Sequence, residues 1–95
     1  MRLWLVTYDI RDDRRLRKVY RLMRGYGQHT QYSVFLCELS ATRFAELQAR
    51  LEQLIAKRRD QVLFVDLGPA GGRTLRKISA LGQPFSRDRV GPIIV

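Results

Sequence analysis

The order of apolar patterns along the chain does most to limit its fold, because extended and helical periodicities alternate. Residues 3–8 (LWLVTY) form an unbroken run of leucine, β-branched and aromatic residues, which is typical of a strand buried on both faces. A helical pattern follows, and then a strand pattern over residues 29–39, which can be read as one strand or two. A second helical pattern leads to a further strand over residues 61–67.

Apolar residues at helical spacing define the two helices, and short polar residues mark where they begin. The stripes are Leu16, Val19, Tyr20 and Met23 in the first helix and Phe44, Leu47, Leu51 and Leu54 in the second. Asp12 or Asp13 can cap the first helix and Ser40 or Thr42 the second, since their oxygens accept hydrogen bonds from first-turn amides. The basic residues 57–59 are expected to complement the negative end of the second helix dipole.

This order is the βαββαβ pattern of an α+β ferredoxin-like sandwich, in which two helices cover one face of an antiparallel sheet. Residues 1–81 are expected to form this domain, with a short amphipathic strand over 73–81, and residues 82–95 to form a C-terminal tail. The strands alternate little, so the second face of the sheet should also be apolar, and we expect a homodimer through it. Residues 90–95 (VGPIIV) are expected to dock as an edge strand on the partner subunit.

Net charge limits the class of partner. Eighteen Lys and Arg residues oppose nine Asp and Glu residues, which gives +9 over 95 residues. Such a balance favours a polyanionic partner, which could be DNA, RNA or an acidic membrane. The alternative is that the charge serves only to keep the protein soluble. No apolar run reaches the roughly 18 residues of a membrane span, and the single Cys37 suits a reducing compartment. We therefore expect a cytoplasmic protein that binds a nucleic-acid backbone and no membrane.

Basic residues are concentrated in the first helix. Residues 11–24 carry six Arg and one Lys against two Asp. A solvated helix face usually mixes signs, so this excess favours phosphate contacts that are strongly salt-dependent and only weakly sequence-specific. A smaller basic group follows the strand expected over residues 61–67. The residues predicted to bind nucleic acid are Arg14, Arg15, Arg17, Lys18, Arg21, Arg76 and Lys77.

Asp9 is the strongest candidate for chemistry, because it stands where the first strand ends, within YDIRDDRR. A carboxylate there can bind Mg²⁺, which usually takes one or two carboxylates and keeps several waters. A two-fold dimer would supply a second copy, so that the pair shares one ion during phosphodiester hydrolysis. The structural alternative is that Asp9 only accepts hydrogen bonds from loop amides. Tyr8 is expected to be an interior aromatic whose hydroxyl finds a partner near Asp9.

Three short motifs carry a family resemblance: YDI at 8–10 with an acid pair soon after, QYSVF at 31–35, and CEL at 37–39. With their spacing, they are similar to the CRISPR-associated Cas-two family, the small partner of the CRISPR integrase in spacer acquisition. The match covers residues 1 to about 80 and not the tail.

The resemblance implies a ferredoxin-like homodimer in which Asp9 faces its twin across the two-fold axis as catalytic residue and metal ligand. It implies either an Mg²⁺-dependent endonuclease acting on single-stranded RNA or double-stranded DNA, or a non-catalytic bridge that holds duplex DNA between integrase dimers. It also places the segment with Tyr32, Ser33 and Phe35 near the acid, and the residues expected to support the site are Tyr8, Ser33 and Phe35. Where many relatives carry a basic residue before QYSVF, this chain has His29.

Overall fold

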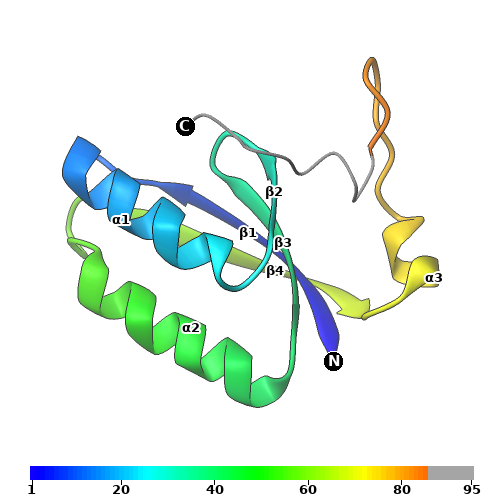
Figure 1. Cartoon of the computed structure of the whole chain (residues 1–95), viewed down its shortest axis with the longest axis horizontal. Helices are drawn as coiled ribbons and strands as arrows, with labels where there is room; N and C mark the ends of the chain where they lie inside the picture. Colours follow the sequence, from blue (N-terminus) through cyan, green and yellow to red (C-terminus); the bar gives the residue numbers. More distant parts are fainter. Residues whose placement is uncertain (86–95) are drawn as a thin grey trace.

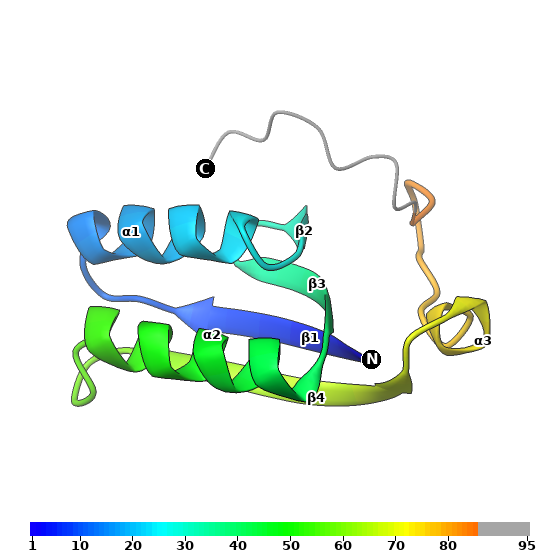
Figure 2. The same cartoon turned by 60° about the horizontal axis from the view of Figure 1, so that its bottom comes forward.

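A computed structural model describes residues 1–85, and its elements follow the expected order. They are β1 (Arg2–Asp9), α1 (Asp13–Arg24), β2 (Gln28–Gln31), β3 (Val34–Leu39), α2 (Ala41–Leu54), β4 (Gln61–Pro69) and α3 (Gly72–Leu75). The strands form one antiparallel sheet in the order β2-β3-β1-β4. Helices α1 and α2 run side by side along it, and α3 lies beyond the end of β4 (Figures 1 and 2). The ferredoxin-like α+β fold is confirmed.

Side-chain caps fix where the long helices begin. Asp12 is the N-cap of α1, and its carboxylate accepts from the Arg15 amide at 2.9 Å. Ser40 caps α2 in the same way through the Arg43 amide at 3.2 Å. Helix α2 ends at Leu54, so the basic residues 57–59 lie in the following turn. The prediction that they complement the helix end was therefore wrong.

The strand pattern over 29–39 is two strands joined by a tight turn. The Tyr8 amide donates to the Ser33 carbonyl at 3.1 Å, which holds this turn against the end of β1. Gly27 leads into β2, and a Cβ there would lie 2.7 Å from the Leu36 carbonyl oxygen. Only glycine therefore allows the chain to pass so closely over β3 as it leaves α1.

The main core lies between the helices and the sheet. Its buried members on β1, α1, β3 and α2 include Val6, Tyr8, Val19, Met23, Phe35, Cys37, Leu47 and Leu51. Trp4 on β1 stacks on Phe44 of α2, with ring centroids 4.0 Å apart. Burial raises the pKa of the Cys37 thiol to about 12, so this cysteine is a packed core residue at neutral pH.

The expected strand over 73–81 is absent, and the short helix α3 stands at its start. The Thr74 hydroxyl donates to the Pro69 carbonyl, and Lys77 Nζ donates to the Leu67 carbonyl at 3.0 Å. These bonds fold the segment back at the end of β4, which prevents it from continuing as an extended strand.

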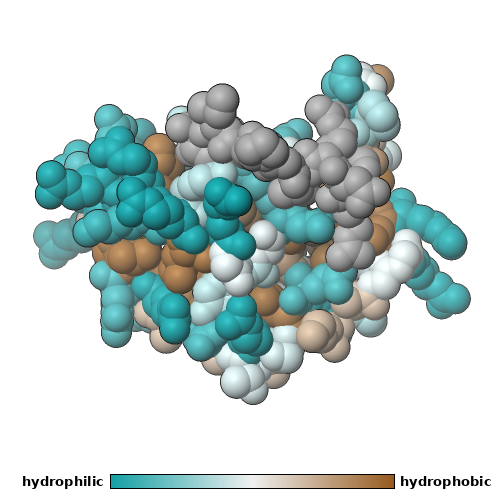
Figure 3. All heavy atoms as spheres, in the orientation of Figure 1, coloured by the Kyte–Doolittle hydropathy of each residue, from teal (hydrophilic) through white to brown (hydrophobic). Residues whose placement is uncertain are grey.

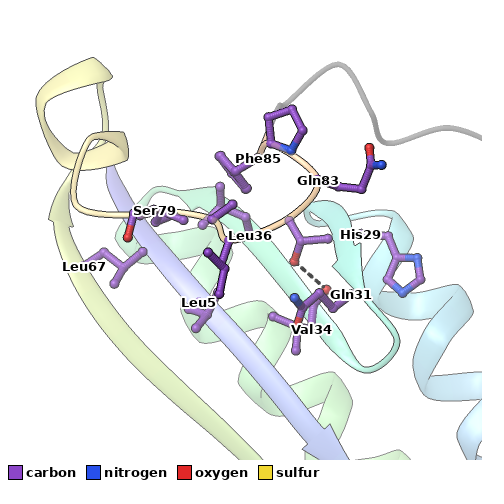
Figure 4. Close-up of a pocket in the computed structure, with 14 residues that line it drawn as sticks. Leu5, His29, Gln31, Val34, Leu36, Leu67, Ser79, Gln83 and Phe85 are labelled. Carbon is purple, nitrogen blue, oxygen red and sulfur yellow. Dashed lines mark hydrogen bonds between the residues drawn. The ribbon is translucent and has the colours of Figure 1, made fainter.

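The segment after α3 covers part of the helix-free face of the sheet. Together with Leu5, Val34 and Leu36 it lines a pocket of about 600 Å³, and Phe85 is among the lining residues (Figure 4). The apolar face expected to be bare is therefore partly covered by the chain itself. On β4, Leu63 and Val65 remain 49% and 44% exposed.

Two further expectations concern the C-terminal residues and membrane-spanning helices. The docking strand predicted over residues 90–95 lies outside the described residues. Within residues 1–85, no helix combines the length and the apolar character needed to cross a bilayer.

Candidate functional site

Asp9 ends β1 on the face of the sheet that the helices leave free. Val6 and Tyr8 point into the helix-side core, so alternation directs Asp9 to the opposite face. Its side chain is 60% exposed, and Arg11 Nη2 lies 3.1 Å from Asp9 Oδ2. Within residues 1–85, no loop amide donates to this carboxylate, and the charged group that contacts it is Arg11.

The carboxylate of Asp9 has the chemistry of a hard-cation ligand, because Mg²⁺ prefers oxygen donors and retains several waters. Among the described residues, however, no three His, Cys, Asp or Glu side chains gather around any point. The described residues of one chain thus fit Mg²⁺ only as part of an open site, to which Asp9 would contribute one ligand.

Asp60, immediately before β4, accepts from a loop amide in the way that the structural alternative expected of Asp9. Its buried carboxylate accepts from the backbone amide of Arg11 at 2.9 Å and that of Ala56 at 2.8 Å. The Arg15 guanidinium donates to both oxygens, at 2.7 and 3.1 Å. Arg15 first, and then the two amides, hold the pKa of Asp60 well below its usual range despite its burial. This network ties the loop after Asp9 to the turn between α2 and β4.

The predicted basic residues of α1 fall into two groups. Arg14, Arg17, Lys18 and Arg21 are all exposed, and within residues 1–85 none of them pairs with an acid. Hydrophilic side chains accordingly gather over α1 (Figure 3). Arg15 differs, because its guanidinium faces Asp60 and its side chain is only 25% exposed. We call the four free residues the α1 basic face.

Arg76 and Lys77 follow α3, at the opposite end of the sheet from Asp9. Asp9 is paired in register with Gln61 at the start of β4, whereas these two residues come after its end. Both side chains are exposed, and Lys77 donates to a backbone carbonyl of β4. The structure therefore does not bring this second basic group together with the acid.

The predicted supporting residues lie together, but mostly on the other side of the sheet from the Asp9 side chain. Tyr8 and Phe35 are buried in the helix-side core, with ring centroids 6.3 Å apart. The Tyr8 hydroxyl has no hydrogen-bond partner among residues 1–85, so the expectation of a partner near Asp9 was wrong. Burial, together with the nearby Tyr20 and Tyr32, raises the Tyr8 pKa to about 12.

His29 lies just before QYSVF, at the position where many relatives were expected to carry a basic residue. It is buried, and its Nε2 lies 2.8 Å from the Tyr32 carbonyl oxygen. The imidazole therefore supports the turn between β2 and β3 rather than extending the basic surface.

Sequence reasoning missed Arg11 and Asp60 as parts of this site. Arg11 stands two positions after Asp9, and this spacing across a strand end was an available signal. Asp60 carried no local signal, because its partners come from segments that only the folded chain brings together.

The sequence and the fold both match characterised proteins. The family described as CRISPR associated protein Cas2 matches residues 1–73. A CRISPR-associated endoribonuclease Cas2 of Synechocystis is 42% identical over the full length of both chains. One of Geobacter sulfurreducens is 39% identical over 87% of this chain and 86% of its own. The crystal structure of Streptococcus pyogenes Cas2 has a TM-score of 0.72 at 34% identity, over 84% of this chain and 99% of that one.

Proposed function

This chain belongs to the family of CRISPR associated protein Cas2, and on that premise we propose that it is a CRISPR-associated endoribonuclease of antiviral defence. It would hydrolyse phosphodiester bonds of single-stranded RNA with Mg²⁺ and act in spacer acquisition with the CRISPR integrase. One observation carries the catalytic part: Asp9 offers an exposed carboxylate on the helix-free face, next to a loop fixed in place by Asp60. Both curated relatives are named as endoribonucleases, which supports the choice of RNA.

The proposal includes a homodimer through the helix-free face. Leu63 and Val65 leave apolar side chains about half exposed on that face, and Asp9 lies on the same face. A two-fold axis there would bring a second Asp9 to the site. An Mg²⁺ held by both carboxylates would supply charge neutralisation and lower the pKa of a bound water.

The residues of this chain would bind and orient the substrate. The α1 basic face presents four cations without acidic partners among the described residues, so it attracts the phosphate backbone through charge. Arg11 balances the Asp9 carboxylate when no other cation is bound there. Arg15 acts on the site indirectly, because its bonds with Asp60 hold the loop in which Arg11 lies.

A second candidate function is a non-catalytic bridge that holds duplex DNA between integrase dimers. The observation that favours it is the α1 basic face itself, which extends along a helix and requires no contribution from Asp9. The two functions are compatible with one dimer and differ in what the loss of Asp9 would do.

The test is cleavage of a 5′-labelled single-stranded RNA with Mg²⁺ or with EDTA, alongside binding of a DNA duplex. Asp9→Ala should abolish the Mg²⁺-dependent cleavage and leave duplex binding unchanged. Asp13→Ala is the matched control, because it removes an exposed carboxylate that does not cap α1. Cleavage by Asp9→Ala at the parental rate would refute the endonuclease. Duplex binding without cleavage by any variant would leave the bridge as the function.

A further inference from the structure

The turn between α2 and β4 carries cations that the predicted nucleic-acid surface does not include. Residues 57–59 are Lys, Arg and Arg, and all three are exposed. Lys57 pairs with Glu52 at 2.9 Å. In the part of the chain that the structure describes, no acid pairs with Arg58 or Arg59. Their placement after the end of α2 removes the helix-dipole explanation for these two charges.

The fold places this turn at the same end of the sheet as Asp9. Arg59 stands two positions before Gln61, the residue paired in register with Asp9. The start of α1 and the turn after α2 lie at one end of the molecule in both views (Figures 1 and 2). Asp60 joins them directly, because it accepts from the Arg11 amide on one side and the Ala56 amide on the other.

The turn also has a fixed backbone. The amides of Arg59 and Asp60 both donate to the Ala56 carbonyl, at 2.9 and 2.8 Å, and the Asp60 carboxylate closes the loop through the Ala56 amide. Because the backbone is already ordered, binding would immobilise only the two arginine side chains.

We propose that Arg58 and Arg59 form a second phosphate-binding element, which holds the nucleic-acid backbone on the α2 side of Asp9. This inference rests on the proposed function and adds a second point of contact to it. The α1 basic face binds the backbone on one side of Asp9, and this turn binds it on the other. Arginine suits such a contact, because its planar fork donates to two phosphate oxygens at once. Arg58 and Arg59 lie at the same end of the molecule as Arg11 and Arg14, so these positive charges repel one another. A bound polyanion would relieve that repulsion.

The test is the salt dependence of RNA binding by Arg58→Ala/Arg59→Ala. A fluorescein-labelled single-stranded RNA in EDTA, where Mg²⁺-dependent cleavage cannot occur, is titrated at several salt concentrations and followed by anisotropy. Each phosphate contact on a single strand contributes about 0.7 to the slope of log K against log salt. Removal of both arginines should make the slope shallower by about 1.4 and, with affinity at 1 M salt unchanged, weaken binding roughly 25-fold near 0.1 M salt.

The matched control is Arg2→Ala/Arg50→Ala, which removes the same number of charges. Arg2 pairs with Asp66 and Arg50 with Glu46, so neither charge is free. The control should keep the parental slope, and thermal unfolding should show that both variants are folded. A parental slope in Arg58→Ala/Arg59→Ala would overturn the inference, as would an equal weakening in the control. Failure of the parent protein to bind the RNA at all would instead contradict the proposed function.

Discussion

Arg15 and Asp60, 45 residues apart in the sequence, form a bidentate ion pair with Arg15 Nε 2.7 Å from Asp60 Oδ2 and Nη2 3.1 Å from Oδ1. The Asp60 side chain is completely buried, and it also accepts from two backbone amides. The pair therefore joins α1, the loop after Asp9 and the turn before β4. Local order at the candidate site depends on this one carboxylate.

Replacing Asp60 with asparagine should lower the free energy of unfolding by about 2–4 kcal/mol. The amide cannot accept from all four donors, and the arginine that faces it loses its buried partner. Urea unfolding at pH 7 measures the loss. Asp66→Asn is the control, because Asp66 is an exposed partner of Arg2 and should lose far less. Equal losses in the two variants would contradict the structural role of Asp60.

Acid should remove the advantage of the parent over Asp60→Asn. The folded pKa of Asp60 lies below its ordinary value of 3.8, because Arg15 and two amides favour the ionised form. The stabilisation is therefore complete above about pH 4 and is lost as the pH falls towards the folded pKa. The difference in unfolding free energy should be about 1 kcal/mol smaller at pH 3 than at pH 7. A difference that is constant from pH 7 to pH 3 would show that Asp60 does not titrate as described.

Arg11→Gln should strengthen the response to Mg²⁺. Arg11 Nη2 lies 3.1 Å from Asp9 and competes there with any other cation. The Mg²⁺ concentration for half-maximal RNA cleavage should fall roughly two- to threefold at saturating RNA, a modest effect because both side chains are exposed. Arg14→Gln, which has no contact with Asp9 among the described residues, should leave that concentration unchanged. A rise in the Arg11 variant would mean that Arg11 assists the site rather than competing within it.

Charge reversal of the α1 basic face should weaken binding of duplex DNA. The variant Arg14→Glu/Arg17→Glu/Lys18→Glu removes three surface cations and should make the salt slope shallower by about 0.9 for each phosphate that the helix no longer binds. Arg76→Glu/Lys77→Glu tests the basic group at the other end of the sheet in the same assay. Parental binding by the triple variant at moderate salt would show that α1 is not the DNA-binding surface.

Much of the fold was predictable from local pattern. The helical stripes predicted α1 and α2, and the capping residues Asp12 and Ser40 were among those expected, because both signals depend on neighbours within one turn. The segment after β4 was not predictable in this way. Its helix is fixed by Thr74 and Lys77 bonding to carbonyls of β4, and those bonds exist only after folding.

The site was predictable in part for the same reason. Asp9 at a strand end and the excess of arginine on α1 are visible in the sequence. The burial of Arg15 against Asp60 is not, because a pattern of charges does not show which arginine faces an acid from a distant turn. Phosphate binding by Arg15 stays a prediction, and the structure gives that residue a structural role as well.

The central claim is that two copies of Asp9 act together at one site, and a mixing experiment tests it most directly. Parent and Asp9→Asn chains are unfolded together, refolded at known ratios and assayed for Mg²⁺-dependent RNA cleavage. If a dimer needs both carboxylates, an equal mixture retains about one quarter of the parental activity, because only that share of dimers carries two intact chains. Retention of one half, with activity falling linearly as the variant fraction rises, would show that each chain cleaves alone and would contradict the account.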